Sequence, residues 1–504
     1  MHGKTDDRIG HLAGIALLTL VLLWPALWFG APPTFFDTEN YYNGGGEAVE
    51  FFLDRTGLNA LFDPKPSGES LAGSSPGQGA REAGAPPNSV RSVPYSVFLN
   101  IAFRAIGPMG AVVPMALVTA WLIWLMMAPV RPTLRFAAGL VTAVFTTMPF
   151  YAAQTMPDIQ AAWLIAIPII VMQRGGVLGR PLAAGLFLAA TAAILVHYSH
   201  IPLAAATGVV LGLWFLRSRR YGAAIVAQLP LVIAVALNLA ISVVIAQSGG
   251  GGPAPSEGAA PAAKPASSLS IAPGRLPILL GRLLEDGVAI RYLSETCPEN
   301  GFTICRVYDQ FPETSRAVLW GPNHIRRAAT PDQMQRISAE ESSLAWHVLL
   351  YDPWAQIRAS TGNTIDQVFR VGFSEMRLAD YEILGPAEID LNMTNPPPRL
   401  LAALDGIQAA ALTLAALALL VFAWRMPAAR APIVLLVLGL LANAFVCGAL
   451  SAPAGRYQGR VVWVVVATAM AFGLSWRESR RTGADLPASA AGPGDPGGTR
   501  RRPA

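Results

Sequence analysis

Charged residues are scarce in this chain of 504 residues. Asp, Glu, Lys and Arg together make up 14% of it, whereas hydrophobic residues make up 53%. Soluble domains carry about 25% charged residues, because their surfaces are solvated. The composition therefore excludes an ordinary soluble domain and indicates an integral membrane protein.

Motifs for nucleotides are missing as well. No GxGxxG loop follows an expected strand, no Walker motif occurs, and no segment reads as a soluble nucleotide-binding domain. Dependence on ATP or on a nucleotide sugar is therefore disfavoured. The net charge of +5 comes mostly from short loops between apolar segments, so we expect no nucleic-acid partner.

Acidic residues and lysines are also absent from the centres of the apolar segments. The most polar residues there are Asn238 and Asn443. A charge buried in hydrocarbon is costly and usually marks an ion pathway. This absence disfavours a transporter driven by protons or sodium.

Long apolar windows recur along the chain. A helix that spans a bilayer needs about 20 predominantly apolar residues. We therefore predict an all-α polytopic membrane protein with about ten transmembrane helices. The windows cover residues 11–30, 109–130, 136–151, 159–172, 181–197, 201–216, 222–247, 406–424, 431–450 and 461–476.

Arginine is concentrated in alternate connections between these windows, for example at Arg131, Arg174 and Arg217. Short loops rich in Lys and Arg stay in the cytoplasm. Lys4 precedes the first window and Arg477 follows the last. Both termini are therefore expected to be cytoplasmic, and the remaining loops face the outside.

This orientation leaves two long outer segments. Each contains a tract of Gly, Pro, Ser and Ala that is typical of a flexible tether. The second also has aromatic and amphipathic runs, with a capping-box pattern at Ser338 and Glu341, and predicts a small, mostly helical outer domain. The expected units are a transmembrane module at 1–247 with a first outer loop at 31–94, a flexible linker at 248–270, a periplasmic domain at 271–405, transmembrane helices at 406–476 and a disordered cytoplasmic tail at 477–504.

Cysteine is rare, with three residues in the chain. Cys297 and Cys305 lie in the outer domain and Cys447 lies inside a window. In an oxidising compartment the first two favour a disulfide, with two unpaired thiols as the alternative. Neither a CxxC spacing nor a neighbouring pair of histidines is present, which argues against a metal site there.

Polar side chains gather where the windows end on the outer side. One group follows the first window in "FFDTENYYNGGG", and others lie in "YAAQTMPDIQ", "HYSHIP" and "SAPAGRYQGRVVW". An outward pair of arginines runs against the usual charge bias and calls for an anionic partner. The candidates are Asp37, Glu39, Tyr41, Tyr42, Asp158, His197, His200, Arg456 and Arg460.

Simpler interpretations stand beside these roles. Carboxylates just outside a helix are ordinarily solvated, and Asp158 fits the N-terminal acid of the next helix. The histidines suit hydrogen bonds to headgroups, and the arginines suit lipid phosphate. Tyr41 and Tyr42 fit an aromatic belt better than a platform for a sugar.

Together the candidates suit transfer of a sugar from a polyprenyl phosphate. A carboxylate, Asp37 or Asp158, would take the proton of the incoming hydroxyl. Arg456, Arg460 and the histidines would stabilise the departing phosphate, because the guanidinium fork fits two of its oxygens.

The first-loop acid, the second acid in the next outer loop, the alternating short loops and the late outer domain resemble the GT-C class of polytopic glycosyltransferases. That class includes protein mannosyltransferases and lipid A aminoarabinose transferases. The resemblance implies that Asp37 belongs to the active site, with Glu39 as a companion, and that the donor is a polyprenyl phosphosugar. It leaves open whether a divalent cation is bound, since some members of the class bind one and others do not.

We therefore expect a bacterial inner-membrane glycosyltransferase that acts at the periplasmic face, with an envelope glycan, lipid or protein as acceptor and membrane lipids around it. Two alternatives remain at this stage. One is a transporter or flippase of lipids or polyprenyl-linked glycans, and the other is a non-catalytic envelope assembly protein.

Overall fold

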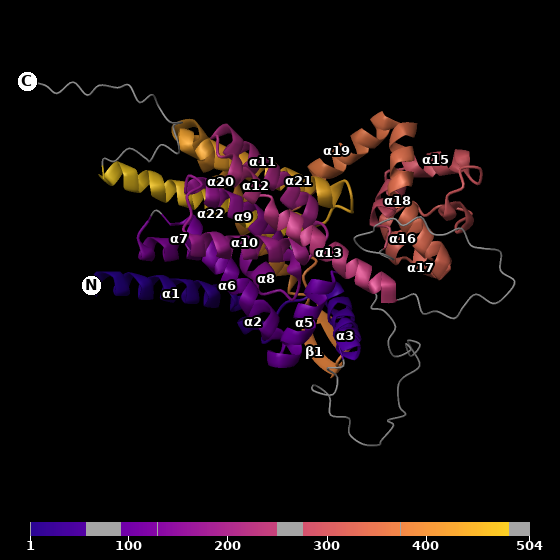
Figure 1. Cartoon of the computed structure of the whole chain (residues 1–504), viewed down its shortest axis with the longest axis horizontal. Coiled ribbons are helices and arrows are strands. Elements are labelled where there is room, and N and C mark those ends of the chain that lie inside the picture. The colour runs from indigo at the N-terminus through magenta and orange to yellow at the C-terminus, as the bar shows by residue number, and fades with distance from the viewer. Residues whose placement is uncertain (1, 57–91, 129, 249–275, 373, 483–504) are drawn as a thin grey trace, which may run out of the picture.

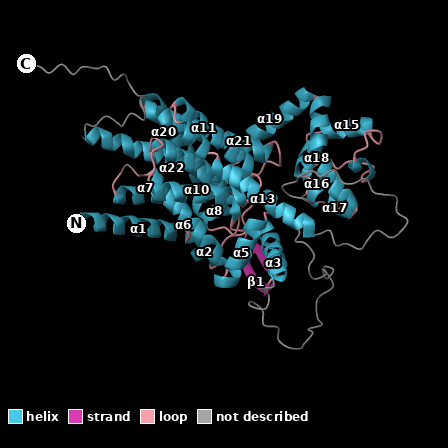
Figure 2. Cartoon of the chain, in the orientation of Figure 1, coloured by secondary structure: helices cyan, strands magenta, loops and turns pink. Residues whose placement is uncertain are grey.

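The structure is a computed structural model, and almost all of its regular elements are helices (Figure 2). Most helices lie in one elongated body, and a smaller helical unit projects from one end of it (Figure 1). Three expected flexible segments lie largely outside the described residues: the tether of the first outer loop within 57–91, the linker at 248–270 except for Ser248, and the tail at 477–504 except for 477–482. Residues 477–482 are helical, contrary to the expected disorder. The structure describes residues 2–56, 92–128, 130–248, 276–372 and 374–482.

Apolar helices make this a helical membrane protein. Among the described residues, six helical segments are long and apolar enough to cross a membrane, and five more are apolar but shorter. The structure thus does not support the expected count of ten spans. The six are α6 (Pro108–Met126), α11 (His200–Arg217), α12 (Tyr221–Val226) with α13 (Leu229–Ser248), α20 (Pro398–Arg425), α21 (Pro427–Gly448) and α22 (Gly455–Thr482). The shorter ones lie in α1 (His2–Leu22), α5 (Val93–Ile106), α7 (Pro132–Val144), α9 (Gln160–Gln173) and α10 (Arg180–Leu195).

Prolines and glycines shorten several of these helices. Pro25 lies at the start of the short α2 (Trp24–Phe29), which ends at Gly30 in the left-handed region with a φ of 78°. Pro157 opens the 3-10 turn η1 (Pro157–Ile159) that leads into α9. A proline lacks the N–H that a helix interior needs, and glycine tolerates a positive φ. These breaks turn the chain at the ends of the helices, where the polar candidates lie.

The described ends of the expected first outer loop, 31–94, are partly helical. The loop begins with α3 (Asp37–Thr56), which packs tightly against α5. A Cβ on Gly45 of α3 would collide with the carbonyl oxygen of Ser96 on α5. Only a residue without a side chain allows this close approach. The pairing of α3 with α5 therefore places Asp37, the first residue of α3, against the body.

Tyr41 and Tyr42 correct an expectation, since both are buried. The ring of Tyr41 packs edge-on against Tyr95 with centroids 4.9 Å apart. The Tyr42 hydroxyl donates a hydrogen bond of 3.1 Å to the carbonyl of Gly385. Neither ring is available as an aromatic belt or as a sugar platform, because α3 turns them into the core.

The expected outer domain at 271–405 divides into two parts. Its helices form a unit with a core of its own, which includes Leu284, Leu293 and Val348. A two-stranded antiparallel hairpin follows, and its Ile389 and Leu391 belong to the core of the main body instead. The hairpin consists of β1 (Leu378–Gly385) and β2 (Glu388–Thr394), and β2 packs on α3 (Figure 2). The helices of the unit are α14 (Ile278–Glu285), α15 (Val288–Thr296), η2 (Thr303–Arg306), α16 (Ser315–Trp320), α17 (Ile325–Ala328), α18 (Pro331–Tyr351) and α19 (Pro353–Phe369).

The start of α18 also differs from the prediction. The Thr330 hydroxyl accepts from the Gln333 backbone N–H at 3.3 Å, and the Gln333 side chain accepts from the Thr330 N–H at 2.8 Å. The capping box therefore begins at Thr330, about two helical turns before Ser338. Glu341 is buried and accepts from the Leu280 N–H at 3.0 Å, so it ties α18 to α14.

Cys297 and Cys305 are joined by a disulfide in the helical unit, whereas Cys447 is a free, buried thiol on α21. A sequence separation of 8 closes a short loop, which restricts the unfolded chain.

We expect the paired variant Cys297→Ala/Cys305→Ala to lower the free energy of unfolding of the helical unit by about 2–3 kcal/mol. Chemical unfolding of the full chain in detergent, followed through the aromatic signal, measures this. A midpoint unchanged by the substitutions would contradict it.

Candidate active site

Three chain segments bring the polar candidates together. These are the residues before α3, the stretch around η1 and the start of α22. Two backbone hydrogen bonds hold the first segment: Thr34 N–H donates to Arg377 at 2.8 Å, and Thr155 N–H donates to Pro33 at 3.0 Å. The first hydrogen bond joins this segment to the chain before β1, and the second joins it to the loop before η1. Residues far apart in the sequence therefore lie side by side at the site.

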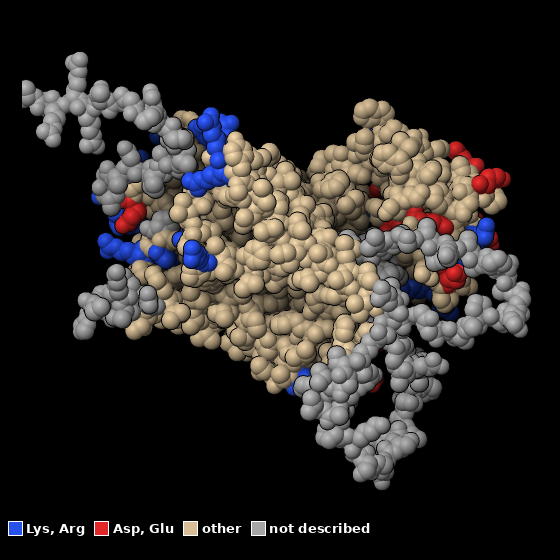
Figure 3. Space-filling model, viewed as in Figure 1, with Lys and Arg blue, Asp and Glu red and all other residues tan. Residues whose placement is uncertain are grey.

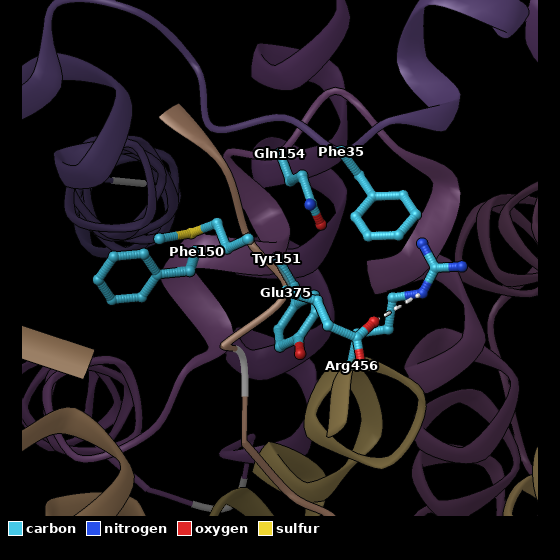
Figure 4. A pocket seen from close by; sticks show the side chains of 7 residues that line it. Phe35, Phe150, Tyr151, Gln154, Glu375 and Arg456 are labelled. Atoms are coloured by element: carbon cyan, nitrogen blue, oxygen red, sulfur yellow. Dashed lines mark ion pairs between the residues drawn. The ribbon is translucent and has the colours of Figure 1, made fainter. Parts of the chain in front are cut away.

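Arg456 is the centre of the arrangement (Figure 4). Its guanidinium carbon lies 3.7 Å from the centroid of the Phe35 ring. Nη2 lies 3.8 Å from Asp37 Oδ2, and Nε lies 3.5 Å from Glu375 Oε2. Nη2 also donates to the Tyr457 hydroxyl at 3.1 Å. Nη1 is buried and has no hydrogen-bond partner among the described residues. Arg456 thus lies between two carboxylates, and its Nη1 is left as a hydrogen-bond donor for a ligand.

A narrow pocket opens beside Arg456 (Figure 4). Its free volume of about 10 Å³ corresponds to roughly one water molecule. A sugar ring needs more room, so binding one requires the aromatic walls to move. The lining residues are Phe35, Phe150, Tyr151, Gln154, Glu375, Met376 and Arg456.

A second ion pair lies beside the first. Arg460 is one helical turn after Arg456 on α22, and its Nη1 donates to Asp158 Oδ1 at 2.9 Å. The two side chains are 1% and 5% exposed. Arg460 Nη2 also reaches Asn443 Oδ1 at 3.4 Å. This geometry suits Asp158 as the counter-charge of a buried arginine better than as a base, and it keeps Arg460 out of reach of a phosphate.

The two histidines have different surroundings. His200 is fully buried at the start of α11, and its Nδ1 lies 2.6 Å from the carbonyl oxygen of Ala193. Nδ1 therefore carries the proton, and the lone pair of Nε2 has no partner among the residues that the structure describes. His200 interacts electrostatically with Arg460 and Asp158. His197 is half-buried, and its Nδ1 lies 2.7 Å from the Ser199 hydroxyl.

Glu39 does not join the group. Its side chain is exposed on α3, two residues beyond Asp37. Partial burial, and after it the negative charge of Asp390 on β2, raise the pKa of the Glu39 carboxyl. Glu39 therefore faces the hairpin, and the acid that lies with Asp37 beside Arg456 is Glu375.

Glu375 was missed because nothing around it signals a site. It lies in "GFSEM", in the short connection between α19 and β1. The backbone bridge between Thr34 and Arg377, together with the hydrogen bond of 2.8 Å from the Tyr381 hydroxyl to the carbonyl of Pro32, brings this connection beside Asp37. Phe35 was part of the quoted motif, but its contact with Arg456 depends on the same folding and has no local signal.

Metal ligands are not gathered here. Within the described residues, no group of three or more His, Cys, Asp or Glu side chains could hold a metal ion. The carboxylates of Asp37 and Glu375 both lie against the guanidinium of Arg456, which supplies their counter-charge.

Comparison of the chain with known protein families, with characterised proteins and with solved structures found no match. The resemblance to the GT-C class therefore stays a prediction, and it rests on the residues of the chain itself.

Proposed function

We propose that the chain is a membrane glycosyltransferase that moves a sugar from a polyprenyl phosphate to an acceptor of the cell envelope. The observation that carries the proposal is the placement of Asp37 against Arg456, at the ends of apolar helices and beside a pocket. A carboxylate and an arginine with an unused donor are the two groups that this transfer needs.

In the proposed reaction Asp37 takes the proton of an acceptor hydroxyl. The hydroxyl oxygen then forms a bond to the anomeric carbon of the donor sugar. The bond from that carbon to the phosphate oxygen breaks, and the polyprenyl phosphate leaves with the electron pair. Arg456 Nη1 donates a hydrogen bond to the departing phosphate, which lowers the barrier where negative charge develops.

An apolar groove supports a lipid substrate. It has a free volume of about 310 Å³ and is lined by side chains of α9 to α13, from Leu164 to Leu231. Ile194 and Ala204 line one part of it, and they flank the turn that holds His200. Side chains of this kind favour an acyl or prenyl chain over a polar ligand. The same groove would serve a flippase, so transfer has to be measured directly.

The charge distribution supports the proposed orientation. On the face drawn in Figure 3, Lys and Arg gather at the end of the body where α1 begins and α22 ends, while the surface of its middle is almost free of charge. We propose that this basic end is cytoplasmic in a bacterial inner membrane and that the candidate site faces the periplasm.

Arg456→Lys tests the role of the guanidinium. Lysine keeps the charge but cannot hold two oxygens at once, nor lie flat on Phe35. We expect the rate of transfer from a panel of labelled polyprenyl phosphosugars, measured in nanodiscs, to fall about 10- to 100-fold. Arg327→Lys, on an exposed helix of the outer unit, is the matched control and should transfer at the rate of the parent.

Two results would count against the proposal. One is equal transfer by Arg456→Lys and the parent. The other is movement of labelled lipid between leaflets of proteoliposomes with no transfer from any donor of the panel, which would favour a flippase.

A further inference from the structure

Helix α19 carries its apolar side chains on the outside. Trp354 is 75% exposed and Phe369 is 78% exposed, with Ile357 and Ile365 exposed between them. At 3.6 residues per turn these four share one face of the helix, together with the small side chain of Thr361 and the long side chain of Arg358. A helix that met only water would present polar groups here.

The opposite face of α19 is polar, and its side chains form hydrogen bonds with other parts of the protein. Gln356 Nε2 and Asn363 Nδ2 each donate to the Asp286 carboxylate at 2.9 Å. Gln367 Nε2 donates to the carbonyl of Ala454 at 2.9 Å, and the Ala454 N–H donates back to Gln367 at 2.8 Å. The polarity is thus reversed relative to a helix on a soluble protein, because the protein binds the polar side.

The position of α19 explains this reversal. The helix packs on the end of the span α21, where a Cβ on Gly448 would lie 2.5 Å from the carbonyl oxygen of Asn363. It then leads away from the body toward the helical unit (Figure 1). In the same half of α21, Leu441 and Phe445 are exposed apolar side chains of a membrane span. The lipid-facing surface therefore extends to the level at which α19 attaches.

The exposed apolar surface continues onto the end of α18. Trp346 and Leu350 are exposed there, just before the turn that leads into α19. Tryptophan is enriched where a bilayer meets water, since its ring is apolar and its N–H is polar. Arg358 is exposed within this face, where its aliphatic stem can lie along the apolar side chains and its guanidinium can reach a lipid phosphate.

The geometry points to a second membrane contact that is not a span. The apolar face of α19, with the end of α18, lies in the interfacial region of the outer leaflet and holds the helical unit against the bilayer. The bilayer fits better than a protein partner because the face is continuous with the lipid-exposed end of α21. The inference does not depend on the proposed transferase activity.

Fluorescence quenching in vesicles tests this contact with the full-length chain. Ile357→Cys is labelled with a nitrobenzoxadiazole (NBD) fluorophore, and the chain is reconstituted in phosphatidylcholine and phosphatidylglycerol that carry a spin label high on the acyl chain. Gln335→Cys, exposed near the N-terminal end of α18 and about three helical turns before Trp346, is the matched control. The parent chain is the labelling control, because Cys447 is buried and the other two cysteines are bonded.

We expect the lipid quencher to act on the Ile357 site at least about twofold more strongly than on the Gln335 site, since an interfacial helix buries its apolar face among the headgroups and upper acyl chains. Iodide in the water should show the reverse order. Equal lipid quenching at both sites overturns the inference. So does protection of the Ile357 site from iodide without lipid quenching, which indicates a second copy or another protein. Ile365→Cys provides a second site if Ile357→Cys fails to accumulate.

Discussion

Asp37→Asn is expected to lower transfer about 10²- to 10⁴-fold, the usual contribution of a general base. The amide keeps the shape of the side chain but cannot accept the proton of the acceptor hydroxyl. The side chain is 13% exposed and its carboxylate lies 3.8 Å from Arg456, so the substitution changes the chemistry of the site more than its packing. Mass spectrometry of envelope glycans from cells that carry each form shows the loss. Transfer in nanodiscs gives its size.

The matched control is Glu382→Gln, which removes an exposed carboxylate from β1 on the same outer side. It should leave the glycan profile and the transfer rate as they are in the parent. The amounts of both variants in the membrane have to equal that of the parent. An unchanged glycan profile in Asp37→Asn cells that accumulate the protein would exclude the transferase role and favour an assembly protein.

Asp158→Asn is expected to lower the free energy of unfolding by about 3–5 kcal/mol. Arg460 is buried and ion-paired to Asp158 at 2.9 Å, so removing the carboxylate leaves its charge largely uncompensated in a medium of low dielectric constant. The neighbouring Asn443 supplies only a neutral acceptor at 3.4 Å. Reversible unfolding in mixed lipid and detergent micelles measures the change.

Asp332→Asn is the control for this second prediction. Asp332 and Arg336 form an ion pair at 3.1 Å on α18 with both side chains exposed, and such pairs contribute about 0–1 kcal/mol. The double variant Asp158→Leu/Arg460→Met removes both buried charges and should recover much of the lost stability. If Asp158→Asn costs no more than Asp332→Asn, the buried pair does not hold the site together.

Sequence alone was sufficient where the signal is local. Each expected apolar window contains helical residues, because hydrophobic length and the breaks at proline are properties of short segments. Scarcity of charge made the outer acids and arginines stand out. Asp37 and Arg456 do lie beside each other, and so do Asp158 and Arg460.

The pairing itself, and everything that depends on contacts between distant segments, was decided by the tertiary structure. Glu375 joined the site through a bridge between Thr34 and Arg377, and Glu39 turned away from it. Tyr41 and Tyr42 are buried and not at the surface, because α3 packs on α5 and on the hairpin.

Membrane character, the helices and the kinds of residue at their outer ends thus follow from the order of the amino acids alone. The tertiary structure decided which of those residues meet, which carboxylate is held as a counter-charge and which face of α19 is left without a protein partner among the described residues. The physical reason is that hydrophobicity acts through segments of about 20 residues. A site, in contrast, depends on burial and charge contacts between residues hundreds of positions apart, as Asp158 and Arg460 are.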